Sequence, residues 1–431
     1  MYTLSELKQR RRQLLTAVDS NAIIILASAA EHFRNGDVYY PYRQNSDFYY
    51  LTAFPEPDAI ALLLPDAQGG KCILFNRPYD PLQAIWHGES IGQEKACEQY
   101  AVDEAYAIDQ LEILLPDYLV GRCHYYWLGA QDSPIVKRVN KVITSLNKVT
   151  VQQEDLVRLP DILHEMRLRK SPSELACLRQ AASISSQAHG RAMQACRPGL
   201  YEYQLEAELL HAFYQEGCRA SAYPSIVASG GNACILHYTD NNSVLKSGDL
   251  VLIDAGCEYQ FYASDITRCF PISGQFSPEQ KAIYAIVLKA QQEVIDLIKP
   301  GVVWKCLQTR CIQIITEGLL DLGLLKGEVS SLIEQKAYKK FYMHGCSHWL
   351  GLDVHDVGRY KQDKRWRPLE ANMVFTVEPG IYIADQTPDI DEKWWNIGVR
   401  IEDDVRVTED SCEVLSRVPK DILDIESLMR S

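Results

Sequence analysis

The strongest constraint on this chain is a pair of aspartates placed within apolar stretches. Asp254 ends the apolar run Val251–Ile253, and Asp265 lies eleven positions later in a similar setting. A hairpin that turns at Tyr259-Gln260 would place the two aspartates directly opposite each other, with Cβ atoms about 5 Å apart. At an effective dielectric constant near 20, two such charges about 4 Å apart repel by roughly 4 kcal/mol. We therefore expect a cation beside them.

Two further acidic residues and one histidine occupy comparable settings. Glu378 ends the apolar run Met373–Val377, Glu402 follows Ile401, and His348 lies between the two acidic pairs in the sequence. Four carboxylates and one imidazole form a ligand set for two divalent ions. Oxygen-rich ligation with a single nitrogen favours a hard metal such as Mn²⁺, with Co²⁺ and Zn²⁺ as alternatives.

Several segments around these residues carry a resemblance to a known family. They are His344–Gly358, Val377–Gly380 and Arg400–Asp403, supported by Cys234–Thr239 and by the N-terminal motif Tyr40–Phe48. Together they resemble the pita-bread metallopeptidases, and most closely bacterial Xaa-Pro aminopeptidase (aminopeptidase P), over nearly the whole chain. The resemblance implies an α+β fold, in which a C-terminal pita-bread domain follows a smaller α/β domain.

The resemblance also implies the metal ligands and their roles. Asp254 would bind one ion through both oxygens, Asp265 and Glu402 would bridge both ions, and His348 and Glu378 would complete the shell of the second ion. A hydroxide held between the ions would attack the scissile carbonyl, because metal coordination lowers the pKa of water to about 7 in well-studied zinc enzymes. Glu378 would accept its proton and pass it to the leaving prolyl nitrogen.

Three histidines near the ligands follow from the same resemblance. His237, His344 and His355 would hydrogen-bond the substrate or the tetrahedral centre, and His355 would help to stabilise the oxyanion. The spacing of His344 and His348 is also that of the zinc motif H-E-x-x-H. The intervening residues are Gly, Cys and Ser, so the catalytic glutamate of that motif is absent.

Three other residues have two interpretations each. Arg400 lies two positions before Glu402, on the same strand face, and either orients carboxylates or takes part in the active site. Tyr382 resembles a family tyrosine near the metals, with weaker support. Trp86 either packs within its own domain or reaches the active site of a neighbouring subunit. The second interpretation of Trp86 implies a homo-oligomer, either a tetramer or a dimer.

The length of the chain predicts two domains, because 431 residues exceed the size of about 250–300 at which single cores stop growing. We place an N-terminal α/β domain at 1–170 and the catalytic domain at 171–431. Ser171-Pro172-Ser173-Glu174 and Ser277-Pro278-Glu279-Gln280 are each typical of a capped helix start. In the first domain we expect strands at 22–26, 48–51, 59–64 and 72–75 and near 125–128, and helices at 4–18, 109–119 and 134–147.

The net charge and the cysteines indicate which partners and which cell compartment to expect. The net charge of −13 argues against a nucleic-acid or anionic-membrane partner, and the basic run Lys8–Arg12 is expected to be a solvated helix face. The thirteen cysteines contain no C-x-x-C pair, which indicates reduced thiols in the cytosol. We therefore expect a cytoplasmic enzyme that acts on peptides.

The predicted reaction is hydrolysis of the bond between an N-terminal residue and a penultimate proline. One alternative is a prolidase, which cleaves only Xaa-Pro dipeptides, and the motif Tyr40–Phe48 disfavours it. A second alternative, of a different class, is a pita-bread binding module without catalysis. Such modules typically lose metal ligands, and none of the five is missing from this sequence.

Overall fold

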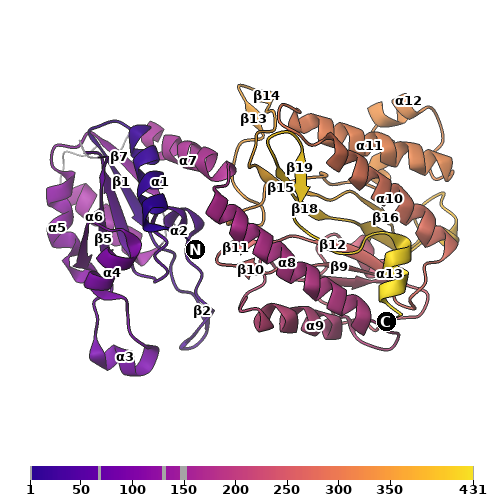
Figure 1. The fold of residues 1–431 in the computed structure, drawn as a ribbon, viewed down its shortest axis with the longest axis horizontal. Coiled ribbons are helices and arrows are strands. Elements are labelled where there is room, and N and C mark those ends of the chain that lie inside the picture. The colour runs from indigo at the N-terminus through magenta and orange to yellow at the C-terminus, as the bar shows by residue number, and fades with distance from the viewer. Residues whose placement is uncertain (1, 67–68, 129–132, 146–152, 431) are drawn as a thin grey trace. The chain divides into compact units, whose positions relative to one another are not determined.

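The computed structural model describes residues 2–66, 69–128, 133–145 and 153–430. The chain divides into two compact units, Met1–Arg167 and Leu168–Ser431, which we call unit 1 and unit 2 (Figure 1). Unit 1 contains a five-stranded sheet, and unit 2 contains several shorter sheets flanked by long helices. This mixture of helices and strands agrees with the predicted α+β class.

The sheet of unit 1 is mixed, in the order β6-β5-β4-β1-β7. Strand β1 pairs antiparallel with β4 and parallel with β7. The central strands β1 and β4 are apolar and buried throughout, because both faces of the sheet are covered there. Helices α5 and α6 contribute Leu111, Leu115, Val136 and Val139 to the core on one face. The strands are β1 (Ala22–Ala27), β4 (Ile60–Leu64), β5 (Lys71–Asn76), β6 (Glu104–Ala107) and β7 (His124–Leu128).

One predicted strand of unit 1 is wrong. Residues 48–51 belong to helix α2 (Ser46–Thr52), because the Asn45 side chain caps the helix by accepting a hydrogen bond from the Phe48 amide at 3.0 Å. The other helices are α1 (Leu4–Thr16), α3 (Pro81–His87), α4 (Gly92–Tyr100), α5 (Leu111–Leu119), α6 (Pro134–Ser145) and α7 (Gln153–Leu168), and a hairpin joins β2 (Phe33–Asn35) to β3 (Val38–Tyr39).

The basic run in α1 is not a fully solvated face as predicted. Arg10 and Arg11 are buried, and their guanidinium groups donate to main-chain carbonyls. Arg10 donates to Tyr50 O at 3.1 Å, and Arg11 donates to Leu51 O and Ala101 O at 2.9 Å each. These two arginines therefore donate to main-chain carbonyls at the C-terminal ends of helices α2 and α4 rather than facing water.

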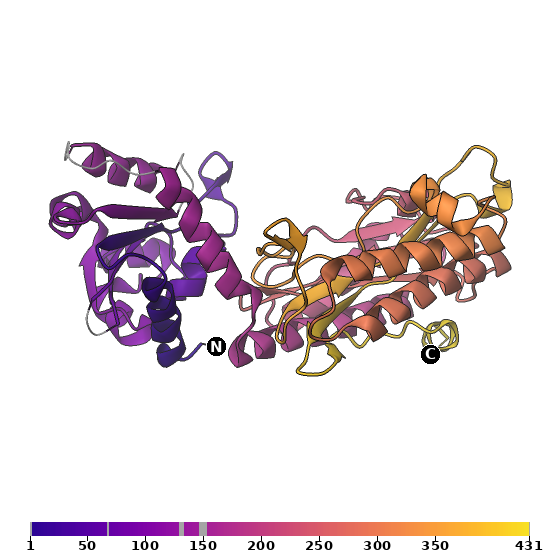
Figure 2. The ribbon, with the colours of Figure 1, turned by 90° about the horizontal axis from the view of Figure 1, so that it is seen from above.

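Unit 2 is built from two helix pairs around short antiparallel strands. Helices α10 and α11 lie side by side along the strands in Figure 2, and the predicted capping boxes at Ser171 and Ser277 are present. The helices are α8 (Pro172–Ala195), α9 (Glu202–Gln215), α10 (Pro278–Leu297), α11 (Trp304–Asp321), α12 (Val329–Glu334) and α13 (Ile422–Leu428). The sheets are β12-β9-β8 and β15-β18-β19, with two-stranded pairs β10-β11, β13-β14 and β16-β17.

The strands of unit 2 are short and mostly buried. Their bounds are β8 (Ile226–Ser229), β9 (Leu250–Asp254), β10 (Glu258–Tyr259), β11 (Tyr262–Ala263), β12 (Thr267–Pro271), β13 (Lys361–Gln362), β14 (Arg365–Trp366), β15 (Val374–Val377), β16 (Gly380–Ile383), β17 (Ile397–Arg400), β18 (Asp403–Val407) and β19 (Cys412–Val414). An isolated bridge between Thr267 and Glu402 joins β12 to the residue that precedes β18.

The predicted hairpin exists, but its predicted register is wrong. The turn lies at Gln260-Phe261, both of which have positive φ, and Asp254 pairs with Thr267 rather than with Asp265. Moving the turn by one residue moves the pairing by two, so Asp265 stays on the same face of the hairpin as Thr267. The two aspartates are therefore diagonal neighbours and still point toward one place.

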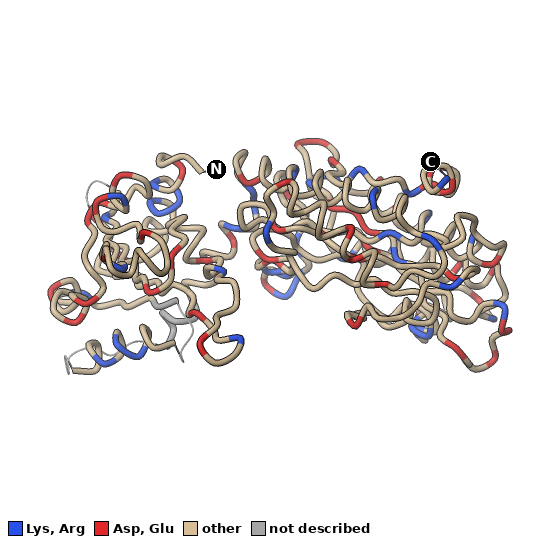
Figure 3. The backbone as a smooth tube through the Cα atoms, turned by 90° about the horizontal axis from the view of Figure 1, so that it is seen from below, with Lys and Arg blue, Asp and Glu red and all other residues tan. Residues whose placement is uncertain are grey.

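Other bulk properties agree with the composition. All thirteen cysteines are free thiols, and acidic and basic residues are interspersed along the backbone of each unit in Figure 3. Within the part of the chain that the structure describes, no helix combines the length and apolar character needed to cross a bilayer.

Candidate metal centre

Unit 2 contains a cavity of about 620 Å³ whose walls include nine of the predicted site residues. Asp254 ends β9, Glu378 directly follows β15, and Glu402 directly precedes β18. Ends of strands thus place the acidic side chains at the cavity. The nine residues are Asp254, Asp265, His237, His344, His348, His355, Glu378, Arg400 and Glu402.

Three of these residues are close enough to share one ion. Ligand atoms of Asp265, His348 and Glu402 all lie within 4.8 Å of one another. His348 Nε2 lies 3.3 Å from Asp265 Oδ2 and 3.5 Å from Glu378 Oε1. His348 Nδ1 lies 3.0 Å from the carbonyl of Trp349, which only accepts, so Nδ1 carries a proton and Nε2 faces the carboxylates.

Three of the four carboxylates have raised pKa values because they are buried close together. Burial raises the pKa of Glu402 well above its usual range, and the charge of Asp265 raises it further. Burial likewise raises the pKa of Glu378 to about 7 and raises the pKa of Asp254. Burial opposes the charge on His348, but its hydrogen bond to Asp265 and the charge of Glu378 outweigh burial and raise its pKa to about 9.

Arg400 connects the acidic cluster to two other predicted residues. Its Nη2 donates to Asp254 Oδ2 at 2.6 Å, and its Nη1 donates to the Tyr382 hydroxyl at 3.0 Å. That hydroxyl lies 2.8 Å from His344 Nε2, while His344 Nδ1 lies 2.7 Å from the carbonyl of Gly345. Burial lowers the pKa of His344 to about 4, so this imidazole is neutral and accepts from Tyr382. Tyr382 does not line the cavity and acts from behind it.

Two residues that sequence reasoning did not select also touch the cluster. The Tyr223 hydroxyl lies 2.7 Å from Asp254 Oδ1 and 2.6 Å from Asp265 Oδ1, and can donate to only one of them at a time. Thr267 Oγ1 donates to Glu402 Oε2 at 2.6 Å and accepts from Arg400 Nε at 3.1 Å. Neither residue carries a local sequence signal, because each is defined by its distant partners.

The segment that carries His237 is held by a buried carboxylate from α9. Glu202 is 0% exposed and has no cationic partner among the contacts of the described residues. Its Oε1 accepts from Ser229 N and Ser229 Oγ at 2.7 Å each, and its Oε2 accepts from Ser243 N at 2.9 Å. The hydroxyl of Tyr238, next to His237, donates to Oε2 at 2.8 Å.

The donor set fits divalent metal ions. Four carboxylates meet here, and Arg400 is the cation that contacts Asp254, while His348 faces them with an imidazole nitrogen. Acidic groups buried this close together need further positive charge. Oxygen donors with one imidazole suit a hard divalent ion, in agreement with the residue types.

Trp86 is the predicted site residue that unit 2 does not contain. It lies in α3 of unit 1, where its side chain is 81% exposed. It is not a packing residue of its own unit, so the first of its two interpretations is wrong. Its exposure leaves the second interpretation, contact with another subunit, as a proposal.

Comparisons with known proteins agree along the whole chain. Residues 176–409 match the model of metallopeptidase family M24, and residues 7–126 match that of the aminopeptidase P N-terminal domain. The Xaa-Pro aminopeptidase of Haemophilus influenzae is 47% identical over 425 residues, which cover 98% of this chain and 97% of that protein. The structure of Pseudomonas aeruginosa aminopeptidase PepP superposes with a TM-score of 0.94 at 47% identity, covering 100% of this chain and 98% of that one. A Zn-substituted Escherichia coli aminopeptidase P in complex with product has the same TM-score at 43% identity, covering 100% and 98%.

Proposed function

Because the chain belongs to metallopeptidase family M24 and, within it, to the aminopeptidases P, we propose that it removes the N-terminal residue of peptides whose second residue is proline. The observation that carries the proposal is the convergence of Asp265, His348 and Glu402 within 4.8 Å, beside Asp254 and Glu378. The same convergence argues against the binding module, since none of the five expected ligand residues is missing from the cavity. A prolidase remains the alternative within the fold.

In this proposal the five residues hold two divalent ions, most favourably Mn²⁺. Asp254 would help to hold one ion, His348 and Glu378 would help to hold the other, and Asp265 and Glu402 would serve both. When bound, such ions supply a water nucleophile at neutral pH and polarise the scissile carbonyl. Glu378 would accept a proton from the attacking water and return it to the prolyl nitrogen.

The lining of the cavity supports the proposed preference for proline as the second residue. Proline lacks an amide hydrogen and has a fixed ring geometry, so a site that recognises it uses shape rather than an N–H acceptor. Pro224, Ile226, Leu236 and Val354 give the cavity apolar walls beside the histidines. His237, His344 and His355 would contact the peptide around the scissile bond, and Arg400 would keep Asp254 oriented.

Chelation and substrate length test this proposal together. Metal-free protein should release no amino acid from an Xaa-Pro-Xaa tripeptide, and Mn²⁺ should restore release. His348→Ala should abolish the restoration, whereas His211→Ala, at an exposed position of α9, should leave it intact. Cleavage of the dipeptide with no cleavage of the tripeptide would favour a prolidase. A metal-loaded protein inert toward both would favour the binding module.

We also propose that the chain forms a homo-oligomer through unit 1 and resides in the cytoplasm. Exposed apolar side chains gather in two elements of unit 1, Phe33 and Tyr39 in the β2-β3 hairpin and Leu82, Ile85 and Trp86 in α3. Such side chains usually mark a protein interface. Sedimentation velocity should give a dimer or a tetramer. Thirteen free thiols support a reducing compartment, which cell fractionation would test.

A further inference from the structure

A second layer of charged side chains lies directly behind the candidate metal centre, and Arg268 is at its middle. The Arg268 side chain is 0% exposed. Its Nη1 donates to two main-chain carbonyls, Thr267 O at 2.9 Å and Glu402 O at 2.6 Å. Its Nη2 donates to Asp403 Oδ1 at 2.6 Å. Arg268 thus links the strand that carries Thr267 to the segment that carries Glu402.

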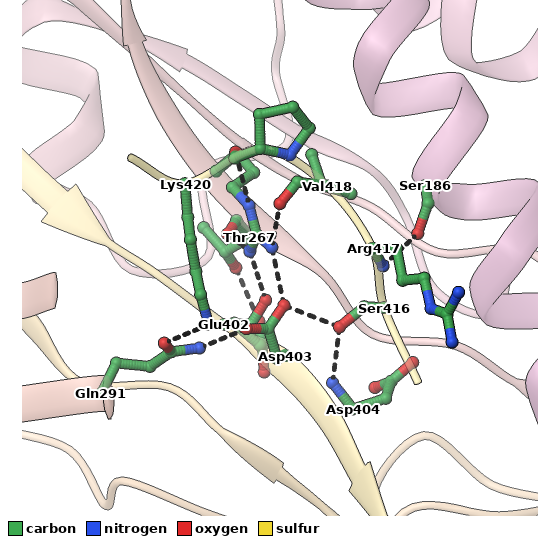
Figure 4. Close-up of polar contacts among 12 residues, drawn as sticks. Ser186, Thr267, Gln291, Glu402, Asp403, Asp404, Ser416, Arg417, Val418 and Lys420 are labelled. Atoms are coloured by element: carbon green, nitrogen blue, oxygen red, sulfur yellow. Dashed lines mark hydrogen bonds and ion pairs between the residues drawn. The ribbon is translucent and has the colours of Figure 1, made fainter. Parts of the chain in front are cut away.

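The segment Ser416–Lys420 completes this layer from the other side (Figure 4). Its carbonyls accept from Arg268, Val418 O at 3.0 Å from Nη2 and Pro419 O at 3.2 Å from Nε. Lys420 Nζ donates to Asp403 Oδ2 at 2.7 Å and to Gln291 Oε1 at 2.8 Å. Ser416 Oγ donates to Asp403 Oδ1 at 2.7 Å and accepts from Asp404 N at 3.2 Å.

These contacts control the place of one carboxylate. Glu402 N donates to Thr267 O at 3.1 Å, and Thr267 Oγ1 donates to Glu402 Oε2 at 2.6 Å. The direction of the Glu402 carboxylate therefore depends on how the two chain segments lie against each other. Arg268 binds the carbonyls of both segments, and its own place is fixed by Asp403 and by the segment Ser416–Lys420.

We propose that Arg268 is a positioning residue for the Glu402 carboxylate, held in place by the C-terminal segment Ser416–Lys420. The inference rests on the proposed function, because it treats Glu402 as a ligand of the divalent ions. The region that matches the family M24 model ends at residue 409, so the segment lies outside that match. The catalytic centre is therefore completed by residues beyond the matched domain.

The sign of a change in metal affinity separates positioning from simple electrostatics. Removing the positive charge of Lys420 would strengthen the binding of a divalent cation if only Coulomb interactions mattered. Loss of positioning would weaken that binding instead. Groups that orient metal ligands typically change metal affinity or activity by about 10- to 100-fold when mutated.

Lys420→Gln is the test variant and Lys281→Gln is its matched control. The Lys420 side chain is 22% exposed and the Arg268 side chain is 0% exposed, so a change at Lys420 disturbs the packing less than a change at Arg268. Lys281, in α10, is 45% exposed and pairs with Glu426 of α13 at 3.1 Å. It forms no ion pair with Asp403 in the described part of the chain. Both variants lose one positive charge. Mn²⁺ binding to the metal-free proteins would be measured by isothermal titration calorimetry, and kcat and KM would be measured on an Xaa-Pro-peptide.

We expect the dissociation constant of the weaker Mn²⁺ site to rise about tenfold in Lys420→Gln, with a fall in kcat and KM within about twofold of wild type. Lys281→Gln should match wild type. Arg268→Lys, which keeps the charge but loses the planar fork, should show a larger loss in the same direction. Unchanged or tighter Mn²⁺ binding by Lys420→Gln would overturn the inference, even if Arg268→Lys fails to fold. A wild-type protein that binds no divalent ion would remove the proposed function and this inference together.

Discussion

Replacing Glu202 by glutamine should destabilise unit 2 far more than the loss of one oxygen suggests. Glu202 Oε1 faces the amide of Ser229, and Oε2 faces the amide of Ser243. A glutamine side chain has one oxygen and one NH₂ group. Whichever way it is turned, one of the two main-chain N–H groups faces a donor and loses its partner.

The magnitude follows from these contacts. A buried donor left without a partner costs about 1–3 kcal/mol, and hydrogen bonds to a charged acceptor contribute about 1.5–3 kcal/mol each. Rotation of the Tyr238 hydroxyl can relieve part of the loss. We therefore expect Glu202→Gln to lower the free energy of unfolding by about 3 kcal/mol. Because Tyr238 follows His237, the KM for an Xaa-Pro-peptide should rise more than kcat falls.

Urea unfolding followed by circular dichroism measures the change, with Glu206→Gln as the control. Glu206 lies one turn later in α9, and its carboxylate accepts a side-chain hydrogen bond from Asn241 Nδ2 at 3.0 Å. Glu206→Gln should lower the free energy of unfolding by less than about 1 kcal/mol. The reasoning is refuted if the two variants unfold at the same urea concentration with equal slopes.

Three other outcomes are expected. Arg400→Lys should lower kcat/KM about 10- to 100-fold with the fold intact by circular dichroism, because lysine cannot contact Asp254 and Tyr382 together; near-normal kinetics would contradict the role of the fork. Trp86→Ala should leave the melting temperature unchanged, since the side chain is exposed, but should reduce activity and shift the sedimentation coefficient. If activity and the sedimentation coefficient both stay at the wild-type values, Trp86 has no intersubunit role. The Mn²⁺ affinity of metal-free protein should rise at least about tenfold from pH 6 to pH 8, because Glu378, with a pKa raised to about 7, must lose its proton to act as a ligand; calorimetry showing a pH-independent affinity would count against this.

The sequence was most informative where a local rule decides the structure. The serine caps at Ser171 and Ser277 and the apolar strands of the first domain agree with the structure, because each depends on a few neighbouring residues. The acidic residues at the ends of apolar runs were informative for the same reason. A carboxylate at the end of a buried strand needs a polar or charged partner, because an unpaired buried charge is costly.

The errors arose where distant contacts override local preference. The aromatic run at Phe48 is typical of a strand, but the Asn45 cap and burial in unit 1 make it helical. The turn at Gln260-Phe261 requires positive φ at both residues, which is usual for Asn and Gly and was not predictable from these side chains. Tyr223 was missed because its partners lie 31 and 42 residues away in the sequence.

The hairpin that carries both aspartates also sets a limit on sequence variation. A Cβ atom built on Gly256 would lie 1.7 Å from the carbonyl oxygen of Ser264, on the facing arm. Every amino acid except glycine has a Cβ atom. Saturation mutagenesis under selection for activity should therefore return only glycine codons at position 256. The backbones of the two arms are in direct contact at Gly256, with no side chain between them. Active variants with another residue at position 256 would show that the two arms can move apart.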